Sequence, residues 1–148
     1  MAVYIIVALV AVAVLWAAYR AFGSATAGPP DNAALLRQAL RAQRDAEAAL
    51  DASTPAKPVL RTLDGIAQLL ERVDAASLDD AGLTAHALLS SSNADLSWAA
   101  KLREAATSGS NPALREAADG LRDHARRCLV EAERLLPSAA AEEVRRLA

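Results

Sequence analysis

A long apolar run near the start of the chain is the strongest pattern in the sequence. Residues 2–19 are eighteen consecutive positions without a charge, a proline or a glycine. As an α-helix they would extend roughly 27 Å, close to the hydrocarbon core of a bilayer, which is about 30 Å thick. Tyr4 lies near one end of the run and Trp16 near the other, where aromatic rings meet the headgroups. The run therefore predicts a single transmembrane anchor over residues 1–22, which contacts the lipid bilayer through residues 2–19.

The residues after the run bear on its orientation and on whether it is cleaved. Residues 25–27, Ala-Thr-Ala, fit the small-residue pattern of a signal-peptide cleavage site. Cleavage after Ala27 is thus an alternative, and it would release a secreted or periplasmic helical protein. A signal peptide has basic residues before a shorter apolar segment, whereas nothing basic precedes this long run, and the difference favours a retained anchor. Because Arg20 follows the run, the positive-inside rule favours a cytoplasmic C-terminal domain.

The pattern changes to a linker and then to helical periodicity. Residues 23–32 (GSATAGPPDN) are small, polar or proline, a composition typical of a flexible linker. Residues 33–148 are predicted to form a helical bundle domain. Its first helix is expected over residues 33–52, with Asp31 or Asn32 as the N-cap. One stripe of this helix, in a face made mostly of alanine, consists of Leu36, Leu40, Gln43, Glu47 and Leu50.

Two prolines within residues 53–58 end the first helix, and a second is expected from Pro58 to Ala76. Its aliphatic stripe repeats at three and four residues. Ser77 and Asp80 have the spacing of a capping box and predict the start of a third helix. Residues 90–93 (SSSN) are expected to interrupt that helix and begin another, the alternative being one long helix with a polar patch. The stripe of the second helix consists of Leu63, Ile66, Leu70 and Val73.

The last long helix is predicted over residues 112–136, since Asn111 is a good N-cap and Pro112 suits the first helical position. An unbroken heptad row runs along it, and we expect this row to be the inner face of the bundle. A partner-binding coiled coil is the alternative. Residues 138–147 are expected to form a short final helix. The heptad row consists of Leu114, Ala118, Leu121, Ala125, Cys128, Ala132 and Leu135.

Composition supports the same fold class. Apolar residues make up 53% of the chain, much of it alanine, and aromatic residues only 3%, which favours helix over strand. The sequence as a whole predicts an all-α protein: an N-terminal single transmembrane helix followed by an antiparallel bundle of four to five helices. The 16 basic and 18 acidic residues are interspersed and give a net charge of −2, so there is no electrostatic case for binding nucleic acid.

One pair of residues has a spacing that metal sites use. His124 and Cys128 are four residues apart on one predicted helix, and Glu131 or His86 would have to supply a third ligand. The alternative is that Cys128, the only cysteine, fills a core position and His124 flanks it. We favour the core role, so a metal-binding or enzymatic domain that uses these two residues remains a minor hypothesis.

Other reactive groups have simpler explanations. The acidic pairs at residues 79–80 and 142–143 lie at expected helix starts, where they complement the helix dipole. Residues 90–92 are three serines outside any nucleophile motif, and the glycines form no phosphate loop. We therefore assign no catalytic, cofactor or metal residue and expect no cofactor. The sequence favours a membrane-anchored, non-enzymatic domain that binds or scaffolds a protein partner whose identity the sequence does not reveal.

Overall fold

Every regular element in the described part of the chain is helical, which confirms the all-α prediction there. A computed structural model describes residues 31–51 and 55–136. The predicted anchor, most of the linker and the expected helix over residues 138–147 lie outside this part. None of the described helices is long and apolar enough to cross a membrane. The elements are α2 (Asn32–Asp51), α3 (Ala56–Glu71), the short 3-10 helix η1 (Ala75–Ser77), α4 (Asp80–Gly109) and α5 (Pro112–Leu135).

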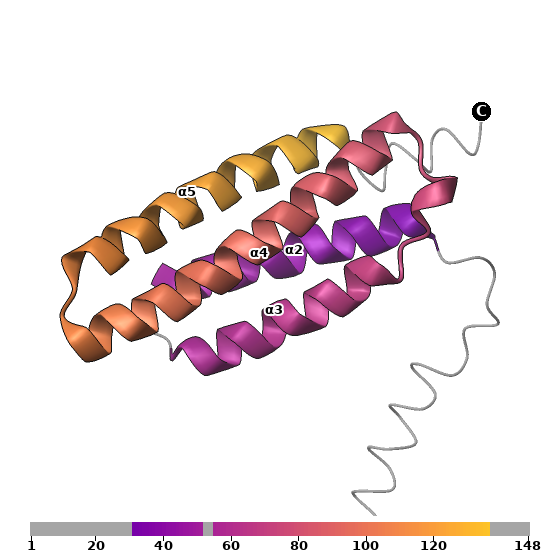
Figure 1. Ribbon diagram of the computed structural model, residues 1–148. Helices are drawn as coiled ribbons and strands as arrows, with labels where there is room; N and C mark the ends of the chain where they lie inside the picture. Colours follow the sequence, from indigo (N-terminus) through magenta and orange to yellow (C-terminus); the bar gives the residue numbers. More distant parts are fainter. Residues whose placement is uncertain (1–30, 52–54, 137–148) are drawn as a thin grey trace, which may run out of the picture. The chain divides into compact units, whose positions relative to one another are not determined.

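The four α-helices lie side by side, and consecutive helices run in opposite directions (Figure 1). Helices α2 and α4 contact each other across the middle, α3 packs against both on one side, and α5 packs against both on the other. The start of α2 is held to the segment between α3 and α4 that contains η1. The side-chain amide of Asn32 donates to the Asp74 carbonyl at 3.3 Å and to the Ser77 hydroxyl at 2.5 Å. This arrangement is a four-helix bundle.

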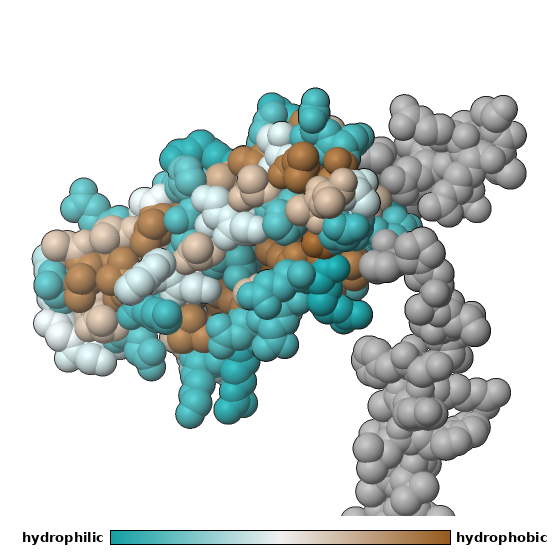
Figure 2. Space-filling view, turned by 45° about the vertical axis from the view of Figure 1, so that its right-hand side comes forward, coloured by the Kyte–Doolittle hydropathy of each residue, from teal (hydrophilic) through white to brown (hydrophobic). Residues whose placement is uncertain are grey.

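The described core of the bundle consists of leucines and alanines in equal number, with Val59, Ile66 and Val73 from α3 and the segment after it. Small side chains between the helices let the backbones approach closely, since interhelical distance follows the side chains at the contact. Each fully buried leucine contributes about 1.5–3 kcal/mol relative to an exposed one. Most charged side chains are left outside, although apolar patches interrupt the hydrophilic surface in Figure 2. The almost completely buried apolar residues include Leu36, Ala39, Leu63, Ala85, Leu89, Leu96, Ala99, Ala100, Ala118, Ala125 and Ala132.

The expected interruption at residues 90–93 is wrong, because α4 runs unbroken from Asp80 to Gly109. Ser90 and Asn93 donate hydrogen bonds without opening the helix, whereas the buried Ser92 hydroxyl has no hydrogen-bond partner among the described residues. The hydroxyl of Ser90 donates to the carbonyl four residues back, at His86, at 2.9 Å. The side-chain amide of Asn93 instead donates across the bundle to the Leu63 carbonyl on α3, at 3.1 Å. The alternative, one long helix with a polar patch, is the correct description.

The start of α4 also differs from the prediction. Ser77 lies in η1, and Asp79 is the N-cap, with its carboxylate accepting from the Gly82 amide at 2.8 Å. The second helix of the sequence, α3, ends at Glu71 rather than at Ala76. A capping box and a simple aspartate cap look alike in the sequence, because serine and aspartate both accept hydrogen bonds from free amides.

The turn between α4 and α5 is short. Ser110 adopts the left-handed conformation, with φ of 49°, and closes α4. Asn111 accepts a hydrogen bond from the Ala113 amide at 3.0 Å, and Pro112 is the first residue of α5. The predicted cap is therefore confirmed, and the two helices form a tight antiparallel hairpin.

The predicted heptad row on α5 is right at its alanines and at Cys128, and wrong at its leucines. Leu114, Leu121 and Leu135 are only half-buried. The buried row is rotated by about one residue, so that Arg122 enters the core with 8% of its surface exposed. The residues of α5 that are buried are Ala118, Arg122, Ala125, Cys128, Leu129 and Ala132.

The physical reason for the rotation is a carboxylate on α2. Oε1 of Glu47 accepts from Nε of Arg122 at 2.6 Å and from Nε of Arg126 at 2.7 Å. The side chains of Glu47 and Arg122 are only 15% and 10% exposed, so both charges are largely removed from water. An arginine enters an interior only with such a partner. Further along the same helices, Arg44 pairs with Glu133 near the surface.

Replacing Glu47 by glutamine should destabilise the bundle. The change keeps the shape of the side chain but removes the negative charge that Glu47 places against the buried guanidinium of Arg122. We expect the free energy of unfolding to fall by about 1.5–3 kcal/mol, the usual worth of a hydrogen bond to a charged group. The measurement is urea unfolding followed by circular dichroism. Glu131→Gln is the matched control, because that glutamate makes an exposed pair with Arg134, and its change should stay within about 0.5 kcal/mol. Equal effects of the two variants would contradict a structural role of the buried pair.

Candidate functional site

The sequence-predicted residues His124 and Cys128 meet a third group that the sequence analysis missed. Nδ1 of His124, on α5, lies 2.6 Å from Oδ2 of Asp95, on α4. Sγ of Cys128 lies 4.0 Å from the same nitrogen. A cysteine, a histidine and a carboxylate in this order resemble the components of a thiol nucleophile. No spacing in the sequence could have revealed Asp95, because it lies 29 residues away on another helix.

The geometry of this cluster does not fit nucleophilic catalysis. A catalytic histidine binds the carboxylate through one ring nitrogen and the nucleophile through the other, whereas Asp95 and Cys128 both face Nδ1. Burial raises the pKa of the Cys128 thiol, and the negative charge of Asp95 raises it further. The charge of Arg127 and a hydrogen bond with Ser91 act in the opposite direction and are smaller. A thiol with a raised pKa is a poor nucleophile at neutral pH, so the cluster links α4 to α5 as a structural contact.

The other members of the metal hypothesis lie in contacts of their own. Glu131 accepts from Arg134 at 3.2 Å, and Nε2 of His86 lies 3.2 Å from the Leu70 carbonyl. Within residues 31–51 and 55–136, no three histidine, cysteine, aspartate or glutamate side chains gather closely enough to hold a metal ion. His124 and Cys128 thus have no complete ligand set in the described part.

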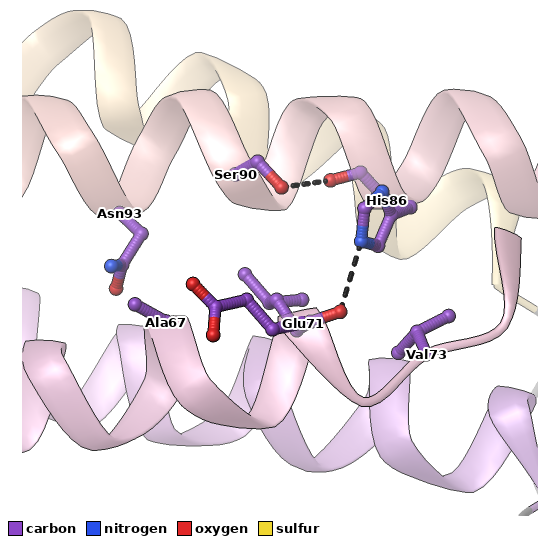
Figure 3. A pocket seen from close by; sticks show the side chains of 7 residues that line it. Ala67, Glu71, Val73, His86, Ser90 and Asn93 are labelled. Carbon is purple, nitrogen blue, oxygen red and sulfur yellow. Dashed lines mark hydrogen bonds between the residues drawn. The ribbon is translucent and has the colours of Figure 1, made fainter.

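A groove of about 310 Å³ lies between α3 and α4 (Figure 3). His86 and Asn93 project from α4, and the Glu71 carboxylate lies across from them on α3. The hydroxyl of Ser90 donates to the His86 carbonyl, so it is not activated by the imidazole. His86 and Asn93 bind backbone carbonyls of α3, Ser90 binds within α4, and the arrangement of these groups indicates no reaction. The groove is lined by Ala67, Leu70, Glu71, Val73, His86, Ser90 and Asn93.

The outward side of α4 is unusual in its lack of charge. We call the exposed residues of α4 between Asp80 and Lys101 the outer face. Asp95, the one acid between these ends, is half-buried and paired with His124. A helix that faces only water normally carries charges on that side, as α5 does. The outer face consists of Asp80, Leu83, Thr84, Ala87, Ser90, Ser91, Ala94, Trp98 and Lys101.

Two large apolar side chains stand on this face. Leu83 is 41% exposed, and Trp98 is 58% exposed. Nζ of Lys101 lies 5.0 Å from the centre of the Trp98 ring, within the range of a cation–π contact. Exposed leucine and tryptophan on a helix side without charges are typical of a surface that binds another protein.

Comparison with known proteins adds no relative. No family model matches the chain, no curated protein matches it, and no solved structure matches it. The functional argument therefore depends on the chain's own residues.

The buried thiol gives a direct test of the structural interpretation of Cys128. In the native protein at pH 8, Cys128 should react with an aromatic disulfide reagent much more slowly than a free thiol, because it is buried and its raised pKa lowers the thiolate fraction. Its reactivity should keep rising above the pH at which an ordinary thiol levels off, and denaturant should abolish the protection. A Cys128→Ala, Ser108→Cys variant supplies an exposed thiol as the control. Fast native labelling of Cys128 would contradict its core position.

Proposed function

We propose that this chain is a single-pass membrane-anchored protein whose helical bundle binds a protein partner through the outer face of α4. The function is scaffolding or recognition rather than catalysis. The observation that carries the proposal is the outer face, which has no exposed charge between its end residues Asp80 and Lys101, with its exposed Trp98 and Leu83. The geometry of the His124 cluster and of the α3–α4 groove supports no competing reaction.

The energetics of protein interfaces favour this face over the rest of the described surface. Charged residues are depleted from the centre of an interface, and tryptophan is the side chain that most often dominates its binding energy. Trp98 is held in place by Lys101 and stands on a rigid helix, so little conformational entropy is lost when it docks. Val130 on α5 is also exposed, but it stands among charged neighbours.

The membrane part of the proposal is supported by the sequence. Residues 2–19 have the length and composition of a transmembrane helix, and residues 23–31, which precede α2, have the composition of a linker. The position of Arg20 after the run favours the cytoplasmic side for the bundle.

The anchor has a direct biochemical test. The full-length protein should stay with membranes after an alkaline carbonate wash, at its unprocessed mass, and protease added to intact cells should spare a C-terminal tag. A mature protein that begins at residue 28 would instead establish the secreted alternative, for which residues 25–27 provide the cleavage pattern. Full-length protein in the soluble fraction would contradict both.

The outer face is tested by two matched substitutions of exposed apolar residues. In membranes from cells that make the tagged full-length protein, Trp98→Ala should abolish cross-linking to the partner, because truncation of a central tryptophan typically costs about 2 kcal/mol or more of binding energy. Val130→Ala on α5 should leave it unchanged. Circular dichroism should show both variants folded, since both side chains are largely exposed. Unchanged cross-linking by the Trp98 variant would reject the outer face as the binding surface.

A further inference from the structure

The outer face has a feature that points to the identity of its partner. We infer that the partner is a second copy of this chain, bound antiparallel through the same face of α4. The inference rests on the proposed function, because it names the occupant of the surface proposed there.

The middle line of the outer face repeats every seven residues. It consists of Asp80, Ala87, Ala94 and Lys101, all of them exposed. Seven residues are close to two turns of an α-helix, so these positions lie in one row along the side away from the bundle core. The remaining residues of the outer face flank this row: Leu83 with Thr84, Ser90 with Ser91, and Trp98.

The outer face matches the outer face of a second copy when the two α4 helices run in opposite directions. A two-fold axis placed between Ser90 and Ser91 brings Ala87 of one copy against Ala94 of the other. The same operation brings Leu83 against Trp98 of the second copy. Both matches occur twice, once on each side of the axis, as an isologous interface requires.

The side-chain sizes suit such a pairing. Alanine and serine occupy the centre, where two helices come closest, and the larger leucine and tryptophan stand further out, where they can cover each other. The small side chains at the centre let the two helices pack without a recess in either of them. The apolar area that becomes buried belongs mainly to Trp98 and Leu83.

The charges at the two ends of the row support the antiparallel direction. The same two-fold axis places Lys101 of each copy against Asp80 of the other. Within the described residues, neither Lys101 nor Asp80 forms a salt bridge inside the chain. A parallel pair in register would instead place lysine beside lysine and aspartate beside aspartate, which is repulsive.

A bilayer surface fits the face less well than a second copy does. A helix that lies on a membrane carries several lysines or arginines beside its apolar side. The outer face has only Lys101, and it begins at the acidic pair of residues 79–80. One helix face is a small interface, so the pairing depends on the high local concentration that anchored molecules have within a membrane.

The test is disulfide cross-linking between two differently tagged full-length copies in the same membranes. One copy carries Ala87→Cys and the other Ala94→Cys, two small exposed positions whose change leaves the fold intact. The mixed pair should form a disulfide under mild oxidation, whereas Ala87→Cys alone and Ala94→Cys alone should not. In the antiparallel pair two identical positions are offset by about 10 Å along the axis, beyond the roughly 7 Å that a disulfide spans between Cα atoms. The unsubstituted chain, with Cys128 buried, is the blank.

A charge exchange tests the register independently. Lys101→Asp and Asp80→Lys, each alone, should lower the yield of the mixed disulfide by roughly tenfold, since each places like charges together twice per pair. The two changes combined in one chain should restore it. Lys57→Asp, on α3, is the matched control and should have no effect.

Each contrary outcome has a distinct meaning. Disulfides from the single variants rather than from the mixture would overturn the antiparallel arrangement. Absence of every disulfide, with Trp98-dependent cross-linking to another protein, would overturn self-pairing and leave the proposed function standing. Absence of every disulfide, with Ala94→Cys shielded from a water-soluble maleimide by the membrane alone, would assign the face to the bilayer. Loss of Trp98 dependence altogether would reject the proposed function itself.

Discussion

The buried pair of Glu47 and Arg122 is the constraint on which the rest of the bundle depends. Alanines are as frequent as leucines in the described core, and where they line a contact little area is buried per residue, so several rotations and offsets of the helices would bury similar area there. Glu47 removes this freedom, because one carboxylate oxygen accepts from both Arg122 and Arg126 and thereby fixes α5 on α2. Two amides complete the set: Gln43 donates to the Leu89 carbonyl at 2.8 Å, and Asn93 donates to the Leu63 carbonyl. Each of these contacts joins two different helices at one height, as buried polar groups do when they specify register.

The parts of the fold that depend on neighbouring residues could be predicted from the sequence. The α3 stripe and the Asn111 cap follow from local periodicity or from local backbone chemistry. The rotation of α5 could not be predicted, because an arginine such as Arg122 is normally expected to face the solvent. Its true place depends on Glu47, 75 residues away. The predicted break at residues 90–93 is wrong for the same reason: the side-chain NH2 of Asn93 donates to the Leu63 carbonyl on α3, a partner that neighbouring residues do not reveal.

The candidate sites show the same division. His124 and Cys128 were found by their spacing, and the sequence already favoured a core role for the thiol. Asp95 was missed, although it decides how the imidazole is held. The outer face was missed for a different reason. Its signal is a lack of charge at positions that only the structure identifies as exposed, and in an alanine-rich chain such a lack is not visible before burial is known. Sequence motifs consist of residues that are present, whereas this surface is distinguished by the absence of charged residues from its exposed positions between Asp80 and Lys101.

The unbroken course of α4 has a consequence for how this protein can change over evolutionary time. One side of the helix packs against three others, and we assign the opposite side to a partner, so few of its positions are free to drift. On α5, by contrast, exposed charged residues such as Glu131 and Arg134 pair with each other at the surface. In a family descended from this chain, we expect α4 to be the slowly varying helix and the surface of α5 to diverge first. The substitution rate along the sequence would then be low at positions that bind the partner as well as at positions that are buried in the fold.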